Sequence, residues 1–213
     1  MFSVLGEKYK ITKTIDHTKD RILLESARLF ALSGYHAVSM RDIAKAVNIQ
    51  SGSIYNHYSS KQGILDAILD KCIELYLIYY DRLDRANEKV ESIEEMIHNM
   101  FYELREVNSL FTYYGFAVAN NLKFENEKAR KLSYDTIFLE GKKRIKNNFD
   151  QGIEKGMIHP FSTEVITDII MNTAMIGIEL RLGEAEGVYF ELEIEQKYAI
   201  LETFLIQAAK AGI

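Results

Sequence analysis

The stretch VSMRDIAKAVNIQSGSIYNHYSSKQGIL, residues 38–65, sets a run of small polar and aromatic residues between two well-marked helical segments. Ser39 and Asp42 have the spacing of a capping box, which predicts a short helix over residues 40–47. Asn48 tolerates the left-handed backbone conformation better than other residues that carry a side chain, so it can end this helix. These local signals predict a short helix followed by a tight turn.

A second short helix is expected over residues 51–58, after which Ser59 and Ser60 cap a long helix that begins at Lys61. Two short helices joined by the turn at residues 48–50 make a helix-turn-helix, the unit whose second helix enters the major groove of DNA. A helix that only packs against its neighbours would not be rich in serine, glycine and asparagine. The composition therefore favours a surface that meets DNA.

The candidate DNA-contacting residues divide by the chemistry of their side chains. Short polar groups at the tip can approach base edges, glycine lets the backbone come close, and the aromatic, histidine and lysine side chains can reach phosphates. An arginine at the start of the first short helix can hold a phosphate or pair with guanine. The arginine and the histidine could equally be ordinary surface residues. The candidates are Ser39, Arg41, Gln50, Ser51, Gly52, Ser53, Tyr55, Asn56, His57 and Lys61.

Charge is distributed unevenly along the chain, whose formal net charge is -5. Residues 1–61 carry nine lysine and arginine residues against five aspartate and glutamate residues, so the remaining chain holds the whole acidic excess. A basic head on an acidic body fits a phosphate-facing module attached to a second part. The single cysteine, Cys72, excludes an intramolecular disulfide and fits a reducing cytoplasm. The sequence contains no run of 18 apolar residues, so no membrane span is expected.

Helical periodicity dominates the whole chain, and it predicts an all-α fold of about nine helices. The long helix from Lys61 to Arg85 reaches from the head into the body. Further helices are expected over residues 18–34, 93–107, 110–122, 126–154, 163–182 and 190–210.

The segment MRDIAKAVNIQSGSIYNHYSSKQGIL resembles the N-terminal domain of the tetracycline-repressor (TetR) family. Asn48 stands where that family usually has glycine, and Tyr58 where phenylalanine is common. The resemblance implies a helix-turn-helix DNA-binding domain, here residues 1–61, followed by an effector-binding and dimerisation domain, residues 62–213. It also implies a homodimer that binds a pseudo-palindromic DNA operator, represses transcription and is released by a small-molecule effector. No cofactor, metal or membrane partner is expected.

The body is rich in aromatic and methionine residues, and the resemblance places an effector cavity among them. Such walls would favour a largely apolar effector. Aromatic residues at helical spacing more often pack a core, so ordinary core packing stays open as the alternative. The candidate ligand-binding residues are Tyr76, Tyr79, Met100, Phe101, Tyr113, Phe116, Tyr134, Phe138, Met171 and Met175.

The last two helices carry apolar stripes that fit a four-helix interface, two helices from each subunit. Ordinary packing within one chain is the alternative. The candidate interface residues are Ile166, Ile170, Thr173, Ala174, Gly177, Tyr198, Leu201 and Leu205.

Two other functions remain to be weighed. A DNA-bound structural or cell-division factor could use the same fold without an effector, and a drug-sized cavity in the body would argue against it. An enzyme would need a positioned nucleophile, an acid–base pair or a metal cluster, and the sequence shows none of these patterns.

Overall fold

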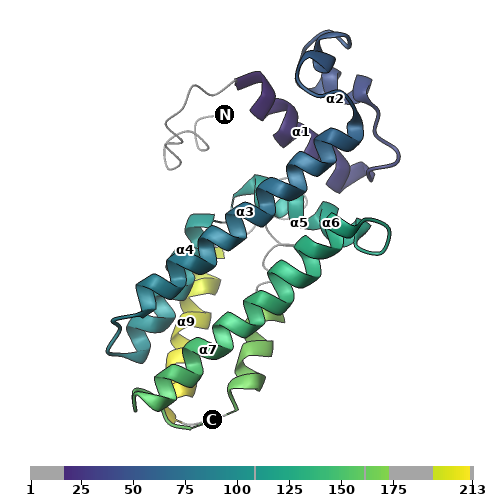
Figure 1. The fold of residues 1–213 in the computed structure, drawn as a ribbon. Coiled ribbons are helices and arrows are strands. Elements are labelled where there is room, and N and C mark those ends of the chain that lie inside the picture. Colours follow the sequence, from purple (N-terminus) through teal and green to yellow (C-terminus); the bar gives the residue numbers. More distant parts are fainter. Residues whose placement is uncertain (1–16, 108, 161, 173–193, 212–213) are drawn as a thin grey trace.

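The computed structural model describes residues 17–107, 109–160, 162–172 and 194–211, and the regular structure in these ranges is entirely helical (Figure 1). This confirms the predicted all-α class. None of the described helices is long and apolar enough to cross a membrane. The elements are α1 (His17–Ser33), α2 (Met40–Ala46), η1 (Ser53–Asn56), α3 (Lys61–Asn87), α4 (Ile93–Val107), α5 (Leu110–Leu122), α6 (Glu127–Arg130), η2 (Lys131–Glu140), α7 (Gly141–Glu154), a helix over 163–172, and α9 (Ile194–Ala211).

The predicted start and end of α2 are confirmed. The Ser39 backbone N–H donates to the Asp42 carboxylate over 2.8 Å, and the Asp42 N–H donates to the Ser39 hydroxyl over 3.2 Å. The Ser39 hydroxyl also donates to the Asp42 carboxylate. This bond, followed by the one from the Ser39 backbone N–H, holds the pKa of Asp42 below its ordinary value, so the cap persists at neutral pH. Asn48 has a φ of 56°, the left-handed conformation that turns the chain out of the helix.

The second short helix is smaller than predicted. The expected helix over 51–58 is a single 3₁₀ turn, Ser53–Asn56, and its first residue has no side-chain cap. Ile54 is fully buried and holds this turn against the head. Serine and glycine before it favour turns over regular helix, because their side chains and flexible backbone compete with helical hydrogen bonding. The polar tip is therefore a tight turn held by one apolar residue.

Helix α3 begins at the predicted position, where the Ser60 hydroxyl accepts a hydrogen bond from the Gly63 N–H. It runs from the head at one end of the molecule to the far end of the body (Figure 1). Its inward face is buried along the whole length, through Ile64, Cys72 and Leu83. Burial raises the pKa of the Cys72 thiol, so this cysteine is an uncharged packing residue.

A second connection between head and body is made by α5, which packs along α1 and crosses α3. The crossing is close because α5 carries Gly115 opposite Cys72. A β-carbon at Gly115 would overlap the Cys72 sulfur and lie 3.6 Å from the Cys72 β-carbon. The head is thus held by two helices of the body.

The predicted helix over 126–154 is present as the continuous run of α6, η2 and α7, capped by Asn126. Its middle part, η2, is wound as a π-helix. The buried Tyr80 hydroxyl of α3 donates to the carbonyl oxygens of Thr136 and Ile137, each over 3.2 Å. Gly141 makes room for it, since a β-carbon there would lie 2.6 Å from the Tyr80 hydroxyl oxygen. The wide turn is therefore fixed to α3.

Candidate nucleic-acid interface

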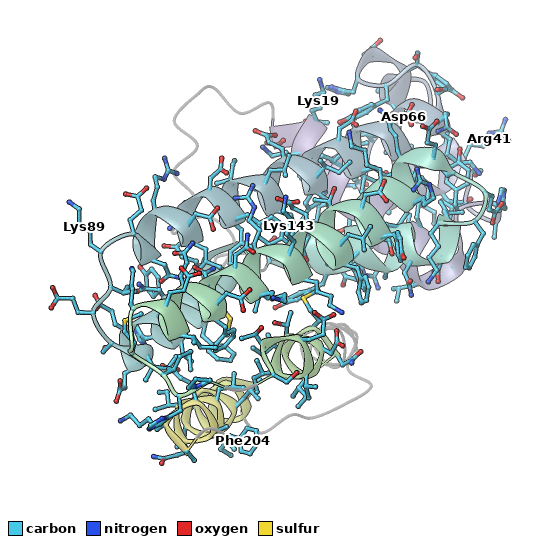
Figure 2. All side chains as sticks on the ribbon, turned by 60° about the horizontal axis from the view of Figure 1, so that its bottom comes forward. Lys19, Arg41, Asp66, Lys89, Lys143 and Phe204 are labelled. Carbon is cyan, nitrogen blue, oxygen red and sulfur yellow. The ribbon has the colours of Figure 1, made fainter. Side chains whose placement is uncertain are left out.

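The helix-turn-helix forms the end of the molecule farthest from α9, and Arg41 projects outward at this end (Figure 2). The polar tip, which we define as residues 50–53, follows directly on the Asn48 turn. Apart from the partly exposed Ser53 and His57, the predicted contact residues of this region are exposed: Ser39, Arg41, Gln50, Ser51, Gly52, Tyr55 and Asn56. The structure thus brings these candidates together on one end of the head.

The opposite side of the same unit is apolar and fully packed. Ile43, Ala44, Val47 and Ile54 are buried, and α2 packs against α1 and η1. Arg21 of α1 donates to the backbone carbonyl oxygen of Val47 over 2.6 Å and so fixes the end of α2 beside the turn. Sequence analysis did not single out Arg21, because its partner is a backbone atom 26 residues away. The tip is presented on a rigid support.

Lys61 does not point outward as a phosphate ligand would. Its ammonium donates to the carbonyl oxygens of Tyr35 and Val38, each over 2.8 Å. This side chain is directed into the turn between α1 and α2, and the expected phosphate contact stays a prediction.

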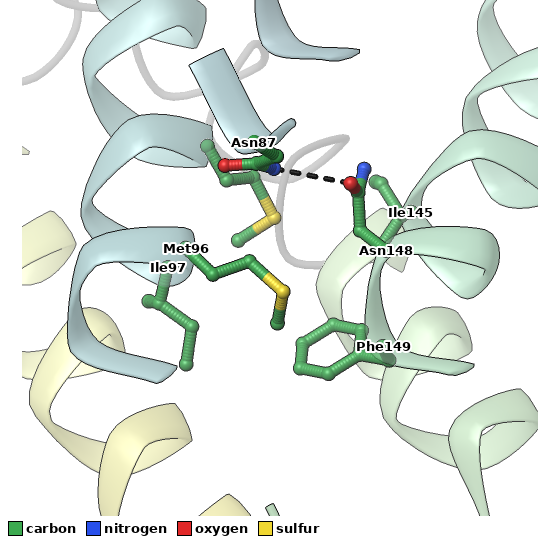
Figure 3. A pocket seen from close by; sticks show the side chains of 7 residues that line it. Asn87, Met96, Ile97, Ile145, Asn148 and Phe149 are labelled. Carbon is green, nitrogen blue, oxygen red and sulfur yellow. Dashed lines mark hydrogen bonds between the residues drawn. The ribbon is translucent and has the colours of Figure 1, made fainter. Parts of the chain in front are cut away.

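The body contains a small cavity between α3, α4 and α7, of about 10 Å³ (Figure 3). This volume is about that of one water molecule and cannot hold a drug-sized ligand. Its lining residues are Asn87, Met96, Ile97, Met100, Ile145, Asn148 and Phe149. Met100 alone among the predicted ligand-binding residues is one of them.

The other predicted ligand-binding residues lie elsewhere. Tyr134 is 49% exposed, and Phe138 stacks on it with ring centroids 5.8 Å apart, so their place in a ligand site stays a prediction. Met175 lies outside the described residues. Those packed in the core are Tyr76, Tyr79, Phe101, Tyr113, Phe116 and Met171.

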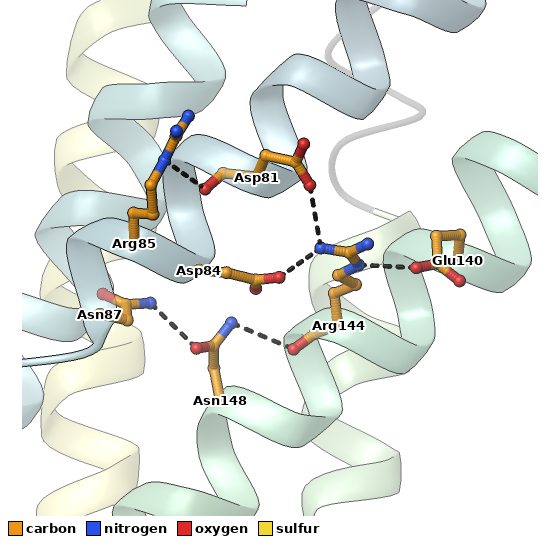
Figure 4. Close-up of polar contacts among 7 residues, drawn as sticks. All are labelled: Asp81, Asp84, Arg85, Asn87, Glu140, Arg144 and Asn148. Carbon is orange, nitrogen blue, oxygen red and sulfur yellow. Dashed lines mark hydrogen bonds and ion pairs between the residues drawn. The ribbon is translucent and has the colours of Figure 1, made fainter.

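Polar contacts beside this cavity join three helices (Figures 3 and 4). The Asn99 amide donates to the Asn87 side chain over 3.2 Å, the Asn87 amide donates to Asn148 over 3.1 Å, and Asn148 donates to the Arg144 carbonyl oxygen over 3.1 Å. Arg144 itself pairs with Glu140, over 2.6 Å, and with Asp84 of α3. Sequence analysis missed this network, because its members come from three separate segments.

The apolar face of the last helices differs from the predicted one. Ile166, Ile170 and Leu205 are buried within the chain and Leu201 is half-buried, so this stripe largely faces the protein's own core. Thr173, Ala174, Gly177 and the side chain of Tyr198 lie outside the described part. Periodicity marked an apolar stripe on each helix but could not tell whether that stripe packs within the chain or against a partner subunit.

The exposed apolar residues lie next to the predicted stripe. We define the outer face as Val165, Ile169, Ile200 and Phe204, which are 56%, 41%, 69% and 55% exposed. Helix α9 is attached to α4, where His98 and Glu202 approach to 3.1 Å, and Phe204 projects from α9 in Figure 2. Val165 and Ile169 lie one helical turn apart, as do Ile200 and Phe204, and exposed large apolar side chains of this kind mark a candidate interaction site.

The helix-turn-helix and the helical body define the class of helix-turn-helix regulatory proteins, and comparisons with known proteins agree. The family model described as bacterial regulatory proteins, tetR family, matches residues 22–68. The HTH-type transcriptional repressor KstR2 of Mycobacterium tuberculosis is 23% identical over 179 residues, which cover 79% of this chain and 84% of the relative. The biofilm operon regulator IcaR of Staphylococcus aureus is 28% identical over 89 residues, 41% of this chain and 48% of the relative.

The solved structure of the ketosteroid transcriptional regulator KstR2 of Mycobacterium tuberculosis has a TM-score of 0.67 at 18% identity, covering 94% of this chain and 96% of that one. The structure of a gamma-butyrolactone receptor has a TM-score of 0.58 at 18% identity, and the match covers 89% of this chain and 96% of that one. Residues 22–68 therefore match the DNA-binding domain of the tetR family of bacterial regulatory proteins, and the whole chain shares the fold of the solved regulators.

Proposed function

We propose that this protein is a ligand-responsive transcriptional repressor that binds a pseudo-palindromic DNA operator as a homodimer. One observation carries the proposal: an exposed polar tip is held on a rigid apolar support at the end of a helix that runs through the body. KstR2, named as a transcriptional repressor, and IcaR, named as a negative transcriptional regulator, support the direction of regulation. The proposed location is the bacterial cytoplasm, where the DNA lies.

The tip residues are proposed to read base edges, and the surrounding residues to hold the DNA backbone. Gln50, Ser51 and Ser53 are short polar side chains at the tip, and Gly52 leaves space for a close approach of the backbone. A substitution at Gly52 would meet no atom of the protein within 4 Å, so its lack of a side chain has no packing cause within the chain. This fits a position where DNA, and not the protein, fills the space.

Dimerisation is proposed to use the outer face defined above. The two-fold symmetry of such a dimer would place two heads on successive half-sites about 34–36 Å apart. Residues 1–61 would then act as the DNA-binding domain and residues 62–213 as the effector-binding and dimerisation domain.

The effector is proposed to be small and largely apolar. The structural neighbours include a ketosteroid regulator, a gamma-butyrolactone receptor and a putative fatty acid metabolism regulator, and their names all refer to apolar or amphipathic small molecules. The cavity at Asn87 holds a volume of only about 10 Å³, so an effector there would need the Met96 and Met100 side chains to move. Methionine side chains are flexible enough for this. Signals would pass to the head through both α3 and α5.

The proposal is tested by measuring the affinity for a DNA site selected by the protein, with and without three probes: a 3-ketosteroid, a long-chain fatty acid and a γ-butyrolactone. We expect at least one probe to weaken DNA binding by about 5- to 150-fold, the usual range of allosteric coupling. The same probe must bind more weakly to the DNA-bound protein by the same factor. Tight, specific DNA binding with no response to any probe would favour the alternative, a DNA-bound structural or cell-division factor without an effector.

A further inference from the structure

The turn between α1 and α2, residues 34–38, directs several backbone carbonyl groups toward one point. Gly34 has a φ of 83°, and its N–H donates to the Phe30 carbonyl oxygen over 3.1 Å, which ends α1. The following residues leave the helix, so their carbonyl groups need partners from another part of the chain. The partner comes from the first residue of α3.

Lys61 supplies three donors to three carbonyl groups. The distances from its ammonium nitrogen are 2.8 Å to Tyr35 O, 2.8 Å to Val38 O and 3.5 Å to His36 O. The same nitrogen lies 4.4 Å from the centre of the Tyr35 ring, within cation–π range. A lysine ammonium has three N–H donors, so this arrangement uses all of them and leaves none for a DNA phosphate.

A second contact joins the same turn to α3. The Tyr35 hydroxyl donates to the side-chain oxygen of Gln62 over 3.0 Å. The Tyr35 ring packs edge-on against Phe30, with centroids 5.1 Å apart and planes 78° apart. The turn is therefore attached to α1 by a ring contact and to α3 by two side chains.

The position of α2 depends on this turn. Val38 is buried, and Ser39, directly after it, forms the capping box that starts α2. A movement of Val38 would move the cap, and with it the helix that carries the tip. The charge-assisted hydrogen bonds of Lys61 therefore help to fix the position of α2 relative to α3.

We propose that Lys61 is a positioning residue for DNA recognition, which fixes the helix-turn-helix to α3, and that it does not serve as a phosphate ligand. The inference rests on the proposed DNA-binding function. It predicts that the loss of Lys61 lowers affinity without removing an ionic contact to DNA.

The salt dependence of DNA binding separates the two roles. The logarithm of the affinity falls as the logarithm of the salt concentration rises, and each phosphate contact adds about 0.9 to the magnitude of this slope. We expect Lys61→Met to weaken binding of the selected site about tenfold or more, with the slope unchanged. Arg41→Met is the matched control, because it removes the same charge from an outward side chain. It should reduce the magnitude of the slope by about 0.9.

Hydrogen exchange provides the second readout, measured well below the unfolding temperature. Amides of residues 39–47 should exchange faster in Lys61→Met than in the wild type, while those of α4 and α7 stay unchanged. If Lys61→Met does not fold, Lys61→Gln, which keeps two donors, takes its place with the same expectations.

If the magnitude of the slope is smaller by about 0.9 in the Lys61 variant, Lys61 contacts a phosphate and the inference is overturned. Unchanged affinity and unchanged exchange would overturn it as well. If the wild type itself shows no salt-dependent binding to any selected DNA, the proposed function fails, which is a different outcome from either of these.

Discussion

Replacing Phe204 with glutamate will convert the proposed dimer into a monomer and lower the affinity for the DNA site about a hundredfold or more. Phe204 and Ile200 are large apolar side chains of α9 that are more than half exposed, so a partner subunit is the expected cover. A carboxylate at this position would have to be desolvated without a counter-ion to remain in an interface. Because two linked heads gain about 10²- to 10⁴-fold over one head, loss of the dimer removes that gain.

Phe124→Glu is the matched control for this substitution. Phe124 is 92% exposed in the segment between α5 and α6, away from α9, so the same change of chemistry should leave the assembly intact. Sedimentation velocity reports the mass of each variant, and fluorescence anisotropy reports its DNA affinity. If the Phe204→Glu protein sediments as a dimer, the outer face is not the dimer interface.

The second large effect is expected at the crossing of α3 and α5. Gly115→Ala places a β-carbon onto the Cys72 sulfur, which is fully buried, so the surrounding core must shift to accept it. Overpacking of a well-filled core costs about 1–3 kcal/mol. We expect the free energy of unfolding to fall by about 2 kcal/mol, and we expect a displaced α5 to disturb α1 as well.

A double-mutant cycle tests whether this clash is the cause. In the Gly115→Ala, Cys72→Ala double variant the sulfur is gone and the two β-carbons lie 3.6 Å apart, an ordinary contact. The double variant should therefore be more stable than the sum of the single changes predicts. Gly63→Ala, where the nearest atom is 3.5 Å away, is the control for a helical glycine and should be close to neutral. The free energies of unfolding are measured by chemical denaturation. If the loss in the double variant equals the sum of the losses in the two single variants, the clash is not the cause.

Features fixed by neighbouring residues were predictable from the sequence. The capping box of Ser39 and Asp42, the left-handed Asn48 and the Ser60 cap each depend on residues within a few positions, and all three are confirmed. Local spacing carries the physical cause in each case, because the hydrogen-bonding partners are three residues apart or fewer.

Features that depend on tertiary contacts were not predictable in the same way. The ammonium of Lys61 finds its acceptors 23 to 26 residues earlier in the chain, and nothing in its own segment distinguishes them from a phosphate. The stripe of Ile166 and Ile170 has the same period as the exposed Val165 and Ile169, so the sequence could not say which side faces the core. The contacts of the asparagine residues 87, 99 and 148 depend on the packing of three helices.

The central claim is that a two-fold dimer reads DNA with the polar tip, and selection of binding sites from random DNA tests it most directly. The wild type should select two inverted half-sites with centres about 10 base pairs apart, or a multiple of that spacing. Ser53→Ala and Gln50→Ala should each relax the preference at symmetric positions, one in each half-site. A selected pool without inverted symmetry, or base preferences that both substitutions leave unchanged, would contradict the claim.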